Sequence, residues 1–555
     1  MSQYKISKEI LDYTKSIKVD LNEFDFDHHP DIYKTISENI VEPKSITHYS
    51  NIYNKNTKEI LKKISDYNDV NDYNILISAG SDDALEYIIN KYISKDTHVI
   101  IFVPSYNYFE IVVKRHTKNI HYIPMDFNNK ELYDISECLE FYSDILDNAI
   151  VYIVNPSNPL GTLCSSESIK NALSKYNKTT FIIDEAYIEL CKKETCVKLI
   201  NYKNIIISRT FSKAYGLAGI RLGYLIAHQD TISNIKILYN EKNTTDLAKS
   251  AGIAIFNNIS YYENIVDNII KSRVSFENFL QEMKIYYIHS HANFVSFYIG
   301  KNRKKFLEIL ESKLIYIRDR HTQVDMAGFV RITIGKEEHM EIVKDIIKDN
   351  ITIFDDKSNT LVSYYSNKNT IWTLKKLFKK IIKILNKNNF TYWLDGGTLL
   401  GIYRNKGIIP WDDDIDMGML MGDVEKLLSL ETEFKSQGIR LQLNRTKCYY
   451  QFDFGNSSDK INDIHIDIFP YNLNENNDYV NNDPRFIISD DIKCNFTYPI
   501  NDLFPLKKYS FYNILDTYVP CNTEQILTKN LTSDFMEIAY IDENTVLPLN
   551  NAFYA

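Results

Sequence analysis

Between about Asp72 and Gly223, short apolar runs of strand length alternate with segments whose apolar residues recur at helical spacing. The runs lie at residues 74–78, 99–103, 149–154, 181–183 and 205–207. The clearest helical segment begins near Ala84 and continues through Ile89. Strands that alternate with helices are typical of a largely parallel sheet covered by helices. The pattern therefore predicts an α/β fold for this part of the chain.

A second pattern begins after residue 370. Apolar residues recur at helical spacing from Trp372 to Leu385 with lysines between them, which predicts an amphipathic helix whose lysines face solvent. Further on, residues 463–470 alternate between polar and apolar side chains, as a half-buried strand does. Residues 351–370 become polar toward their end and separate the two patterns. We therefore expect one domain over 1–350, a linker over 351–375 and a second domain over 376–555.

The totals agree with a protein of several domains, because 555 residues are too many for one core. A chain that is 44% hydrophobic and 25% charged resembles soluble globular proteins. The net charge of −9, with no long basic block, argues against a nucleic-acid partner. The first 15 residues lack the apolar segment of a signal peptide, and no apolar run is long enough for a bilayer. We expect a cytoplasmic protein without membrane insertion. The seven cysteines, with no C-x-x-C pair, predict neither disulfides nor a zinc site.

One lysine stands in a turn that is rich in hydroxyl groups. Lys213 follows the run at 205–207, with Thr210 and Ser212 just before it and Arg221 eight residues after it. An amine in this position can form a Schiff base with the aldehyde of pyridoxal phosphate (PLP), while hydroxyls and a guanidinium can hold its phosphate. Taken alone, such a lysine is often only a surface residue. The interpretation therefore depends on the residues upstream.

Residues at four upstream positions could bind the other parts of PLP. The residues Gly80, Ser81 and Asp82 open a helix, where backbone N–H groups can bind an anion, although, taken alone, they are better explained as an ordinary N-cap. Tyr106 follows a strand and could stack on an aromatic ring. Asn158 is fixed between prolines in a turn. Asp184 ends an apolar strand, where open α/β sheets bind ligands, and its carboxylate can keep a pyridine nitrogen protonated.

The order and spacing of Asn158, Asp184, Tyr187, Lys213 and Arg221 resemble those of fold-type I PLP enzymes. The resemblance is greatest to the histidinol-phosphate aminotransferase branch, which also contains threonine-phosphate decarboxylases, and it covers roughly residues 18–350. It implies a large domain with a mostly parallel central sheet, a small α+β domain and a homodimer.

The resemblance also implies a role for each matching residue. Lys213 would form the Schiff base and carry the proton between the substrate carbon and the cofactor. Asp184 would pair with the ring nitrogen, Asn158 and Tyr187 would hold the ring hydroxyl, and Tyr106 would stack on the ring. The residues expected around the cofactor phosphate are Gly80, Ser81, Asp82, Thr210, Ser212 and Arg221, with Tyr49 supplied by the partner subunit.

Three further matches concern the substrate. Asn22 lies in the family's N-terminal Asn-Glu element, and Arg331, in Phe329–Gly335, would bind a carboxylate or phosphate as a bidentate fork. Arg318 is a second candidate for anion binding. Residues 24–30 replace the family's usual Pro-x-Gly, and residues 239–244 lack its usual prolines. The substrate therefore stays open, and histidinol phosphate is not the first expectation.

The second domain carries a glycine turn and an acidic run. Gly396 and Gly397 precede a helical segment and would let the backbone approach a phosphate. Asp414 and Asp416 alternate along a strand and share one face, which suits divalent ions of the Mg²⁺ type. Asp467, in the strand at 463–470, could reach the same ions.

The elements Gly396–Gly401 and Pro410–Asp416 resemble the LicD family, phosphocholine-transferase relatives with an α+β nucleotidyltransferase-like fold. The resemblance covers about residues 376–555. It implies that Asp414, Asp416 and Asp467 hold Mg²⁺. The residues expected to cradle the donor phosphates are Gly396, Gly397 and Thr398. Arg404 and Lys406 could add positive charge there or could equally be ordinary surface residues.

Together the two resemblances imply a bifunctional enzyme. The first domain would transaminate a small phosphorylated substrate and yield an aminoalkyl phosphate, such as phosphoethanolamine or serinol phosphate. After activation as a nucleotide diphosphate by another enzyme, the second domain would transfer such a phosphocholine-like group to a glycan. Decarboxylation of an amino-acid phosphate is an alternative, because it uses the same residues and differs in which substrate bond is held perpendicular to the ring. Histidinol-phosphate transamination, with a second domain that only binds a nucleotide or glycan, is another.

Overall fold

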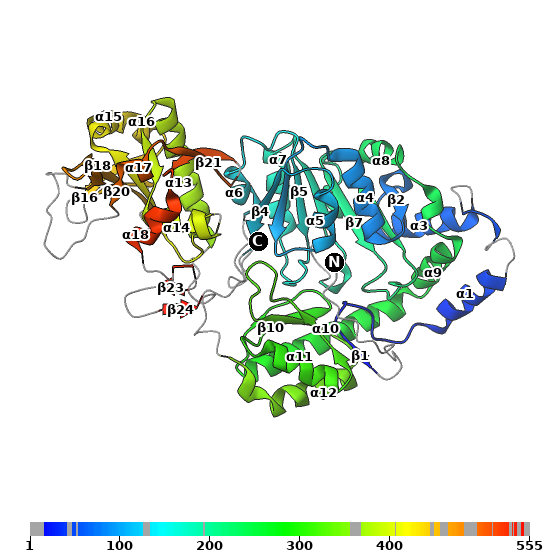
Figure 1. Ribbon diagram of the computed structural model, residues 1–555. Helices are drawn as coiled ribbons and strands as arrows, with labels where there is room; N and C mark the ends of the chain where they lie inside the picture. The colour runs from blue at the N-terminus through cyan, green and yellow to red at the C-terminus, as the bar shows by residue number, and fades with distance from the viewer. Residues whose placement is uncertain are drawn as a thin grey trace. The chain divides into compact units, whose positions relative to one another are not determined.

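The computed structural model describes residues 16–41, 47–50, 54–125, 134–191, 195–355, 368–405, 407–444, 449–454, 464–481, 497–512, 514–531, 535–536, 538–540 and 546–548. Contacts divide the chain into two compact units, one of residues 1–136 and 145–359 and the other of residues 137–144 and 360–555 (Figure 1). Among the described helices, none is long and apolar enough to cross a bilayer.

The first unit is built around a seven-stranded sheet. In spatial order its strands are β2 (Ile75–Ser78), β8 (Gly223–Ala227), β7 (Ile205–Thr210), β6 (Thr180–Asp184), β5 (Ile150–Val154), β3 (Val99–Val103) and β4 (Ile120–Pro124). Only the pairings of β8 with its two neighbours are antiparallel. The largely parallel sheet predicted from the alternating pattern is confirmed.

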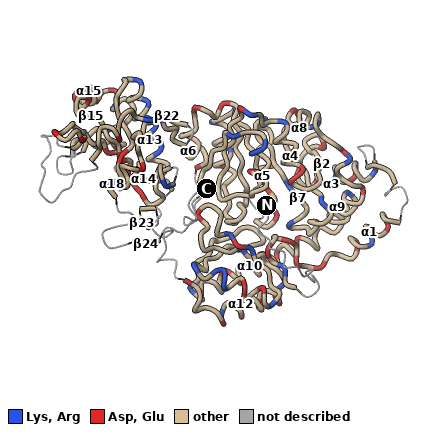
Figure 2. The backbone as a smooth tube through the Cα atoms, viewed as in Figure 1, with Lys and Arg blue, Asp and Glu red and all other residues tan. Residues whose placement is uncertain are grey.

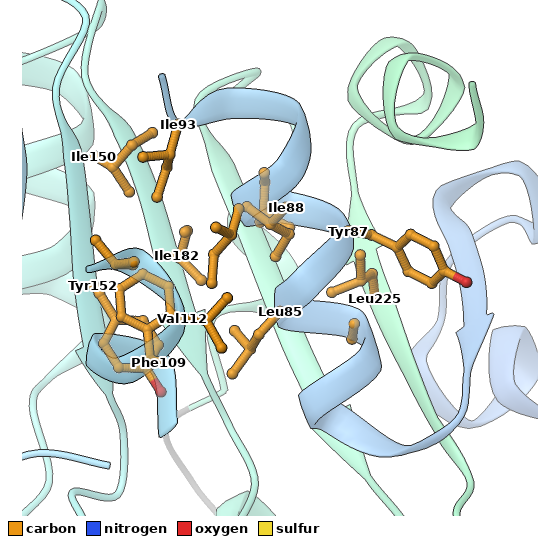
Figure 3. Close-up of a cluster of buried hydrophobic side chains, with 14 of the residues drawn as sticks. Leu85, Tyr87, Ile88, Ile93, Phe109, Val112, Ile150, Tyr152, Ile182 and Leu225 are labelled. Carbon is orange, nitrogen blue, oxygen red and sulfur yellow. The ribbon is translucent and has the colours of Figure 1, made fainter. Parts of the chain in front are cut away.

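Helices cover this sheet and bury its apolar side chains. They are α3 (Lys55–Asn68), α4 (Gly80–Tyr92), α5 (Asn107–Val113), α7 (Ser166–Lys175), α8 (Gln229–Lys236) and α9 (Asp246–Asn257). Figure 3 shows Leu85 and Ile88 of α4 pointing toward the strands beside Ile182. Phe109 of α5 stacks on Tyr152 of β5 with ring centroids 3.7 Å apart. Removal of these side chains from water stabilises the frame that holds the strand ends in place.

A smaller α+β part completes the first unit, as the resemblance implied. Its antiparallel sheet has the order β12 (Arg318–Asp319), β13 (Phe329–Thr333), β10 (Phe294–Tyr298) and β9 (Tyr287–Ile288). The helices α10 (Ile259–Glu282), α11 (Arg303–Ser312) and α12 (Glu337–Asp349) belong to it. Near the N-terminus, β1 (Ile17–Lys18) pairs in parallel with β11 (Ile315–Tyr316), and α1 (Pro30–Val41) follows.

The second unit has a mixed sheet with a central parallel pair. Its main path is β14 (Tyr392–Leu394), β15 (Asp414–Leu420), β18 (His465–Leu473), β17 (Tyr449–Phe454) and β16 (Ile439–Asn444), and β19 (Asp478–Val480) and β20 (Tyr498–Pro499) extend it. Only β15 and β18 run parallel. Two hairpins, β21 (Lys507–Phe511) with β22 (Leu515–Val519) and β23 (Ile538–Tyr540) with β24 (Val546–Pro548), lie outside this sheet.

The helices of the second unit are α13 (Lys368–Lys387), α14 (Gly396–Asn405), α15 (Val424–Ser429), α16 (Glu431–Ser436), α17 (Ile500–Leu503) and α18 (Thr523–Asn530), and the short helix α6 (Ile135–Glu140) reaches into it. The helix predicted over Trp372–Leu385 is therefore present as α13. Of the linker expected over 351–375, residues 356–367 lie outside the described residues, Ile351–Ile353 form a short 3₁₀ helix, and residues from 368 onward are already in α13.

The lysines of α13 are not all solvated, contrary to the expectation. Lys375 is 1% exposed, with its ammonium 3.7 Å from the centre of the Tyr512 ring. Lys379 is 6% exposed and donates to Phe141 O at 2.6 Å, and it pairs with Asp144 at 3.1 Å. Residues 137–144 supply both partners of Lys379, and a segment so far away in sequence could not be foreseen from the periodicity of the helix.

Candidate active sites

Lys213 lies just after the C-terminal end of β7, in the turn expected for it. Its Nζ donates to the backbone oxygen of Leu21 at 3.1 Å. Burial, helped by the positive charge of Arg331, lowers the pKa of Lys213 to about 8. A larger fraction of this amine is therefore neutral and nucleophilic at physiological pH than for an ordinary lysine.

Asp184 is the last residue of β6 and is 2% exposed. Its Oδ2 accepts from the Tyr152 hydroxyl at 2.9 Å, and its Oδ1 accepts from the Ala186 amide at 3.2 Å. Burial raises the pKa of Asp184 to about 7. A buried carboxylate with a fixed orientation is strongly stabilised by a neighbouring cation. The protonated nitrogen of a pyridine ring could be that cation.

A buried network joins the residues that were expected at the ring hydroxyl to those expected at the substrate. The Tyr187 hydroxyl accepts from Asn22 Nδ2 at 2.9 Å and from Asn158 Nδ2 at 3.3 Å. Arg331 Nη1 donates to Asn158 Oδ1 at 2.6 Å, and Arg331 Nη2 donates to Asp20 O at 2.7 Å. Because the network crosses four separated stretches of the chain, it fixes Tyr187 and Arg331 relative to one another.

The expected phosphate end lies at the start of α4. Gly80 has a φ of +84°, and an added Cβ would lie 2.7 Å from Arg221 Nη2, so no other residue fits there without displacing the guanidinium. Arg221 Nη2 donates to Asp82 Oδ2 at 3.1 Å, and the Tyr106 hydroxyl donates to Asp82 Oδ1 at 2.9 Å. Ser81 is the second residue of α4, and Thr210 Oγ1 and Ser212 Oγ lie 2.9 Å apart in the turn before Lys213.

The contacts described above do not include Tyr49. Its side chain is 77% exposed, and the ammonium of Lys242 lies 4.8 Å above its ring. No described contact joins Tyr49 to Arg221 or Lys213 of the same subunit.

Two arginines other than Arg331 lie on the same small-domain sheet. Arg318 of β12 is directly opposite Arg331 of β13, so both side chains leave the same face. Arg320 follows two residues later, and its amide donates to Phe329 O at 3.1 Å. Burial raises the pKa of Tyr187, whereas the charges of Arg331 and Arg320 act in the opposite direction. Arg320 is therefore close to the site. The sequence analysis missed it, although it lies only two residues after Arg318.

The chemical groups in this region fit PLP. An amine stands ready for an aldehyde, a buried carboxylate for a ring nitrogen, and a phenol with an amide for a ring hydroxyl. A helix start and a guanidinium, kept close together by Gly80, can hold a phosphate.

In the second unit, the parallel pair β15 and β18 brings acidic residues together. Asp414 is paired with His465, and Asp416 with Asp467. One ligand atom from each of Asp414, His465 and Asp467 lies within 4.8 Å of the others, and Asp412, Asp413 and Asp414 form a second such group. Figure 2 shows acidic residues, in red, close to α14 in this unit. The sequence analysis missed His465, although the alternation of residues 463–470 places it on the same face as Asp467.

Asp416, which is opposite Asp467 in the parallel register, also contacts the glycine turn. Its Oδ2 accepts from the Gly397 amide at 2.9 Å, and its own amide donates to Thr398 Oγ1 at 2.8 Å. An added Cβ at Gly396 would lie 2.6 Å from the same Oδ2. The residue expected to hold metal is therefore bonded to the turn expected to hold phosphates.

Other groups hold this turn and its surroundings. Asp395 is buried and accepts from the hydroxyls of Tyr471 and Tyr498 and from the Gly396 amide at 2.7 Å. Arg404, in the last turn of α14, donates to Phe535 O at 3.0 Å, and this bond fixes its guanidinium. Lys406 lies outside the described residues.

Comparison with known proteins gives two family matches. Residues 14–347 match the family described as "Aminotransferase class I and II", and residues 389–522 match "LicD/FKTN/FKRP, nucleotidyltransferase domain".

Individual relatives match the first of these regions. A histidinol-phosphate aminotransferase from Ruminiclostridium cellulolyticum is 30% identical over 336 residues, which are 59% of this chain and 91% of that protein. A dihydroxyacetone phosphate transaminase from Campylobacter jejuni is 29% identical over 339 residues, which are 60% of this chain and 89% of that protein. The crystal structure of histidinol-phosphate aminotransferase from Clostridium acetobutylicum has a TM-score of 0.54 and 26% identity, covering 60% of this chain and 99% of that one. An L-threonine-O-3-phosphate decarboxylase from Porphyromonas gingivalis, at 21% identity and a TM-score of 0.53, covers 60% of this chain and 99% of that one and shares the fold.

Proposed function

Because the chain belongs to the class I and II aminotransferases and carries a LicD-family domain at residues 389–522, we propose that it is a bifunctional enzyme that makes and attaches an amino-alcohol phosphate. The first unit transaminates a small phosphorylated substrate with PLP. The second unit transfers a phosphocholine-like or phosphoethanolamine-like group from a nucleotide-activated donor to a glycan hydroxyl, in a reaction that depends on a divalent ion.

PLP, when bound, supplies an aldehyde that condenses with amines and a ring that draws electrons from the substrate's α-carbon. Asp184 holds the proton on the ring nitrogen, because a buried carboxylate is stabilised by that positive charge. Lys213 Nζ takes the proton from the substrate's carbon and returns it, since its pKa of about 8 lies close to the operating pH. Asn158 and Tyr187 orient the ring. Arg221, whose guanidinium lies beside the start of α4, neutralises the phosphate.

The observation that carries the proposal of a phosphorylated substrate is the set of three arginines at this small sheet. Arg318 and Arg331 are cross-strand neighbours, and Arg320 directly follows β12, close enough to Tyr187 for its charge to act on the pKa of that side chain. Several guanidinium groups beside one amine suit a substrate with a dianionic phosphate better than one with a single carboxylate. The two relatives described above are each named for a phosphorylated substrate, which supports the same class.

Transamination is favoured over decarboxylation. The two relatives just named are transaminases, whereas the decarboxylase, at 21% identity, is evidence for the fold alone. A keto phosphate of three carbons would give serinol phosphate. This product is an amino-alcohol phosphate, and we propose that the second unit attaches a group of this class. The chain would then catalyse both the first and the last reaction of one pathway. The activation of the product with a nucleotide is assigned to another enzyme.

For the second unit, the residues that would hold the ion are Asp414 and Asp467, with Asp416 nearby on the glycine turn. They suit a divalent cation, because Asp467 is 3% exposed and its Oδ1 has no hydrogen-bond partner among the described residues. An ion held there would neutralise negative charge on the donor phosphates and so favour attack by the acceptor hydroxyl. Gly396 and Gly397, the first two residues of α14, would receive the phosphates.

A homodimer is part of the proposal. Tyr49 is largely exposed and takes no part in its own subunit's network, which agrees with the resemblance that assigns this tyrosine to the partner's cofactor phosphate. Light scattering of the PLP-loaded protein tests this.

The decisive experiment incubates the PLP-loaded full chain with glutamate and dihydroxyacetone phosphate and measures serinol phosphate and 2-oxoglutarate. Lys213→Ala is the inactive control, and Lys203→Ala, an exposed lysine paired with Asp230, is the matched active control. Both products in stoichiometric amounts support the proposal. Release of CO₂ from phosphothreonine or phosphoserine instead would make the first unit a decarboxylase, and turnover of histidinol phosphate alone would assign it to that substrate.

A further inference from the structure

His465 lies between two carboxylates of the second unit. Its Nε2 is 3.4 Å from Asp467 Oδ2 and 3.8 Å from Asp414 Oδ2. The parallel register of β15 and β18 produces this arrangement, because Asp414 is paired directly with His465, and Asp467 lies on the same strand face two residues later.

These three residues are more than a group of acids on a surface. The Asp467 side chain is buried, and its Oδ1 has no hydrogen-bond partner among the residues that the structure describes. A buried carboxylate oxygen without a partner costs free energy, and such an atom usually has an unseen water or ion beside it. Tyr449 bonds the same carboxylate and fixes its orientation. The unsatisfied oxygen therefore points to a ligand at this place.

The spacing of the atoms suits a shared ion. Nitrogen and carboxylate ligands lie about 2.0–2.2 Å from a divalent metal, so two of them are roughly 3–4 Å apart around it. The two distances from His465 Nε2, 3.4 and 3.8 Å, lie in this range. The Oδ2 atom of Asp416, by contrast, accepts a hydrogen bond from the Gly397 amide. Asp416 is also not among the three residues whose ligand atoms lie within 4.8 Å of one another.

We propose that His465 is a direct ligand, together with Asp414 and Asp467, of the ion that the second unit uses. Mg²⁺ takes oxygen ligands, whereas first-row transition ions accept imidazole nitrogen beside carboxylates. The site therefore binds Mn²⁺ in preference to Mg²⁺. The inference rests on the proposed metal dependence of the second unit and names the ion and a nitrogen ligand that the acidic motif alone does not contain.

The test uses the full chain, Mn²⁺ alone as the probe, and pulsed electron paramagnetic resonance. A histidine ligand gives ¹⁴N modulation of the Mn²⁺ signal, which carboxylates and water do not. We expect this modulation at one equivalent of Mn²⁺ and its loss in His465→Gln. In His465→Gln we also expect Mn²⁺ affinity to fall about tenfold or more. His228→Asn is the matched control, because His228 also lies beside an aspartate, Asp230, at 3.5 Å in the first unit.

A second measurement keeps the result independent of whether the variant folds. Wild-type protein labelled with ¹⁵N-histidine must show the modulation at ¹⁵N frequencies. Tight Mn²⁺ binding without any histidine coupling would overturn the inference, and His465 would then only pair with its carboxylates. If neither Mn²⁺ nor Mg²⁺ binds to the wild-type chain, the failure lies in the proposed metal dependence itself.

Discussion

Arg331 donates to Asn158 Oδ1 at 2.6 Å, and Asn158 in turn donates to Tyr187. The residue proposed for the substrate's anion is therefore hydrogen-bonded to the residues proposed for the ring hydroxyl. A change at one end of this chain of bonds reaches the other end through two direct contacts. The position of the substrate's charge and the position of the ring cannot vary independently.

The first prediction concerns pH. Burial and the charge of Arg331 lower the pKa of Lys213 to about 8, so only the neutral fraction attacks PLP, and that fraction grows as the pH rises. The rate of covalent attachment of PLP to the apoprotein should rise with pH, with a midpoint near 8. In Arg331→Gln the lost positive charge should move this midpoint upward and slow attachment at pH 7.5. A midpoint that stays in place would show that burial alone sets this pKa.

The second prediction concerns the arginine that the sequence analysis missed. Arg320→Gln should raise the KM for the phosphorylated substrate roughly 10- to 100-fold, because it removes a charge-assisted hydrogen bond. The rate of the half-reaction with glutamate should change much less. Arg303→Gln is the matched control, since Arg303 pairs with Asp319, the residue whose side chain alternates to the other face of β12. Equal effects of the two variants would remove Arg320 from the site.

The third prediction concerns the glycine turn of the second unit. Gly396→Ala forces a side chain at a φ of +45° and places its Cβ 2.6 Å from Asp416 Oδ2. We expect a loss of about 1–3 kcal/mol in the free energy of unfolding of this unit. All three tryptophans, Trp372, Trp393 and Trp411, belong to residues 360–555, so tryptophan fluorescence during unfolding reports on this unit alone.

The control for that measurement is Gly422→Ala. A Cβ at Gly422 would meet no atom within 4 Å, so this variant should unfold like the wild type. A similar loss in both variants would mean that the position of Gly396 carries no special constraint.

The fourth prediction separates the two activities. Asp414→Asn should lower group transfer at least about 100-fold, since even changes outside a metal's direct ligands cost 10- to 100-fold. Transamination should remain at the wild-type rate. Asp453→Asn, which loses an exposed pair with Arg440 in the same sheet, should keep both activities. Unchanged transfer in Asp414→Asn would show that transfer does not need Asp414, whereas no transfer by the wild-type chain would reduce the second unit to a binding module.

Much of the first unit could be predicted, because its strands are continuous apolar runs and its motifs stand at the strand ends. Asp184 and Lys213 follow directly from that rule. Arg320 and His465 were missed for different reasons. Arg320 lies two residues after Arg318 in the sequence, where a second anion-binding arginine could have been expected. The place of His465 depends on the pairing of β15 with β18, and the register between strands fifty residues apart is set by tertiary packing rather than by local sequence.

The burial of Lys375 and Lys379 shows the same limit. The periodicity of α13 correctly predicted a helix with one apolar stripe. Which lysines are covered depends on residues 137–144, which lie more than two hundred positions earlier in the chain. Hydrophobic periodicity identifies the packed face of a helix, but it contains no information about a second segment that covers the polar one.

The bond from the Gly397 amide to Asp416 has a consequence for how a donor would enter. A phosphate that reaches this N–H must displace a carboxylate that is already there and cannot diffuse away. Binding at the start of α14 is thus an exchange of one anion for another. The donor's affinity therefore depends on how much more strongly the amide binds the phosphate than it binds the Asp416 carboxylate. A modest change in the surroundings of Asp416 would alter that affinity as much as a change in the turn itself.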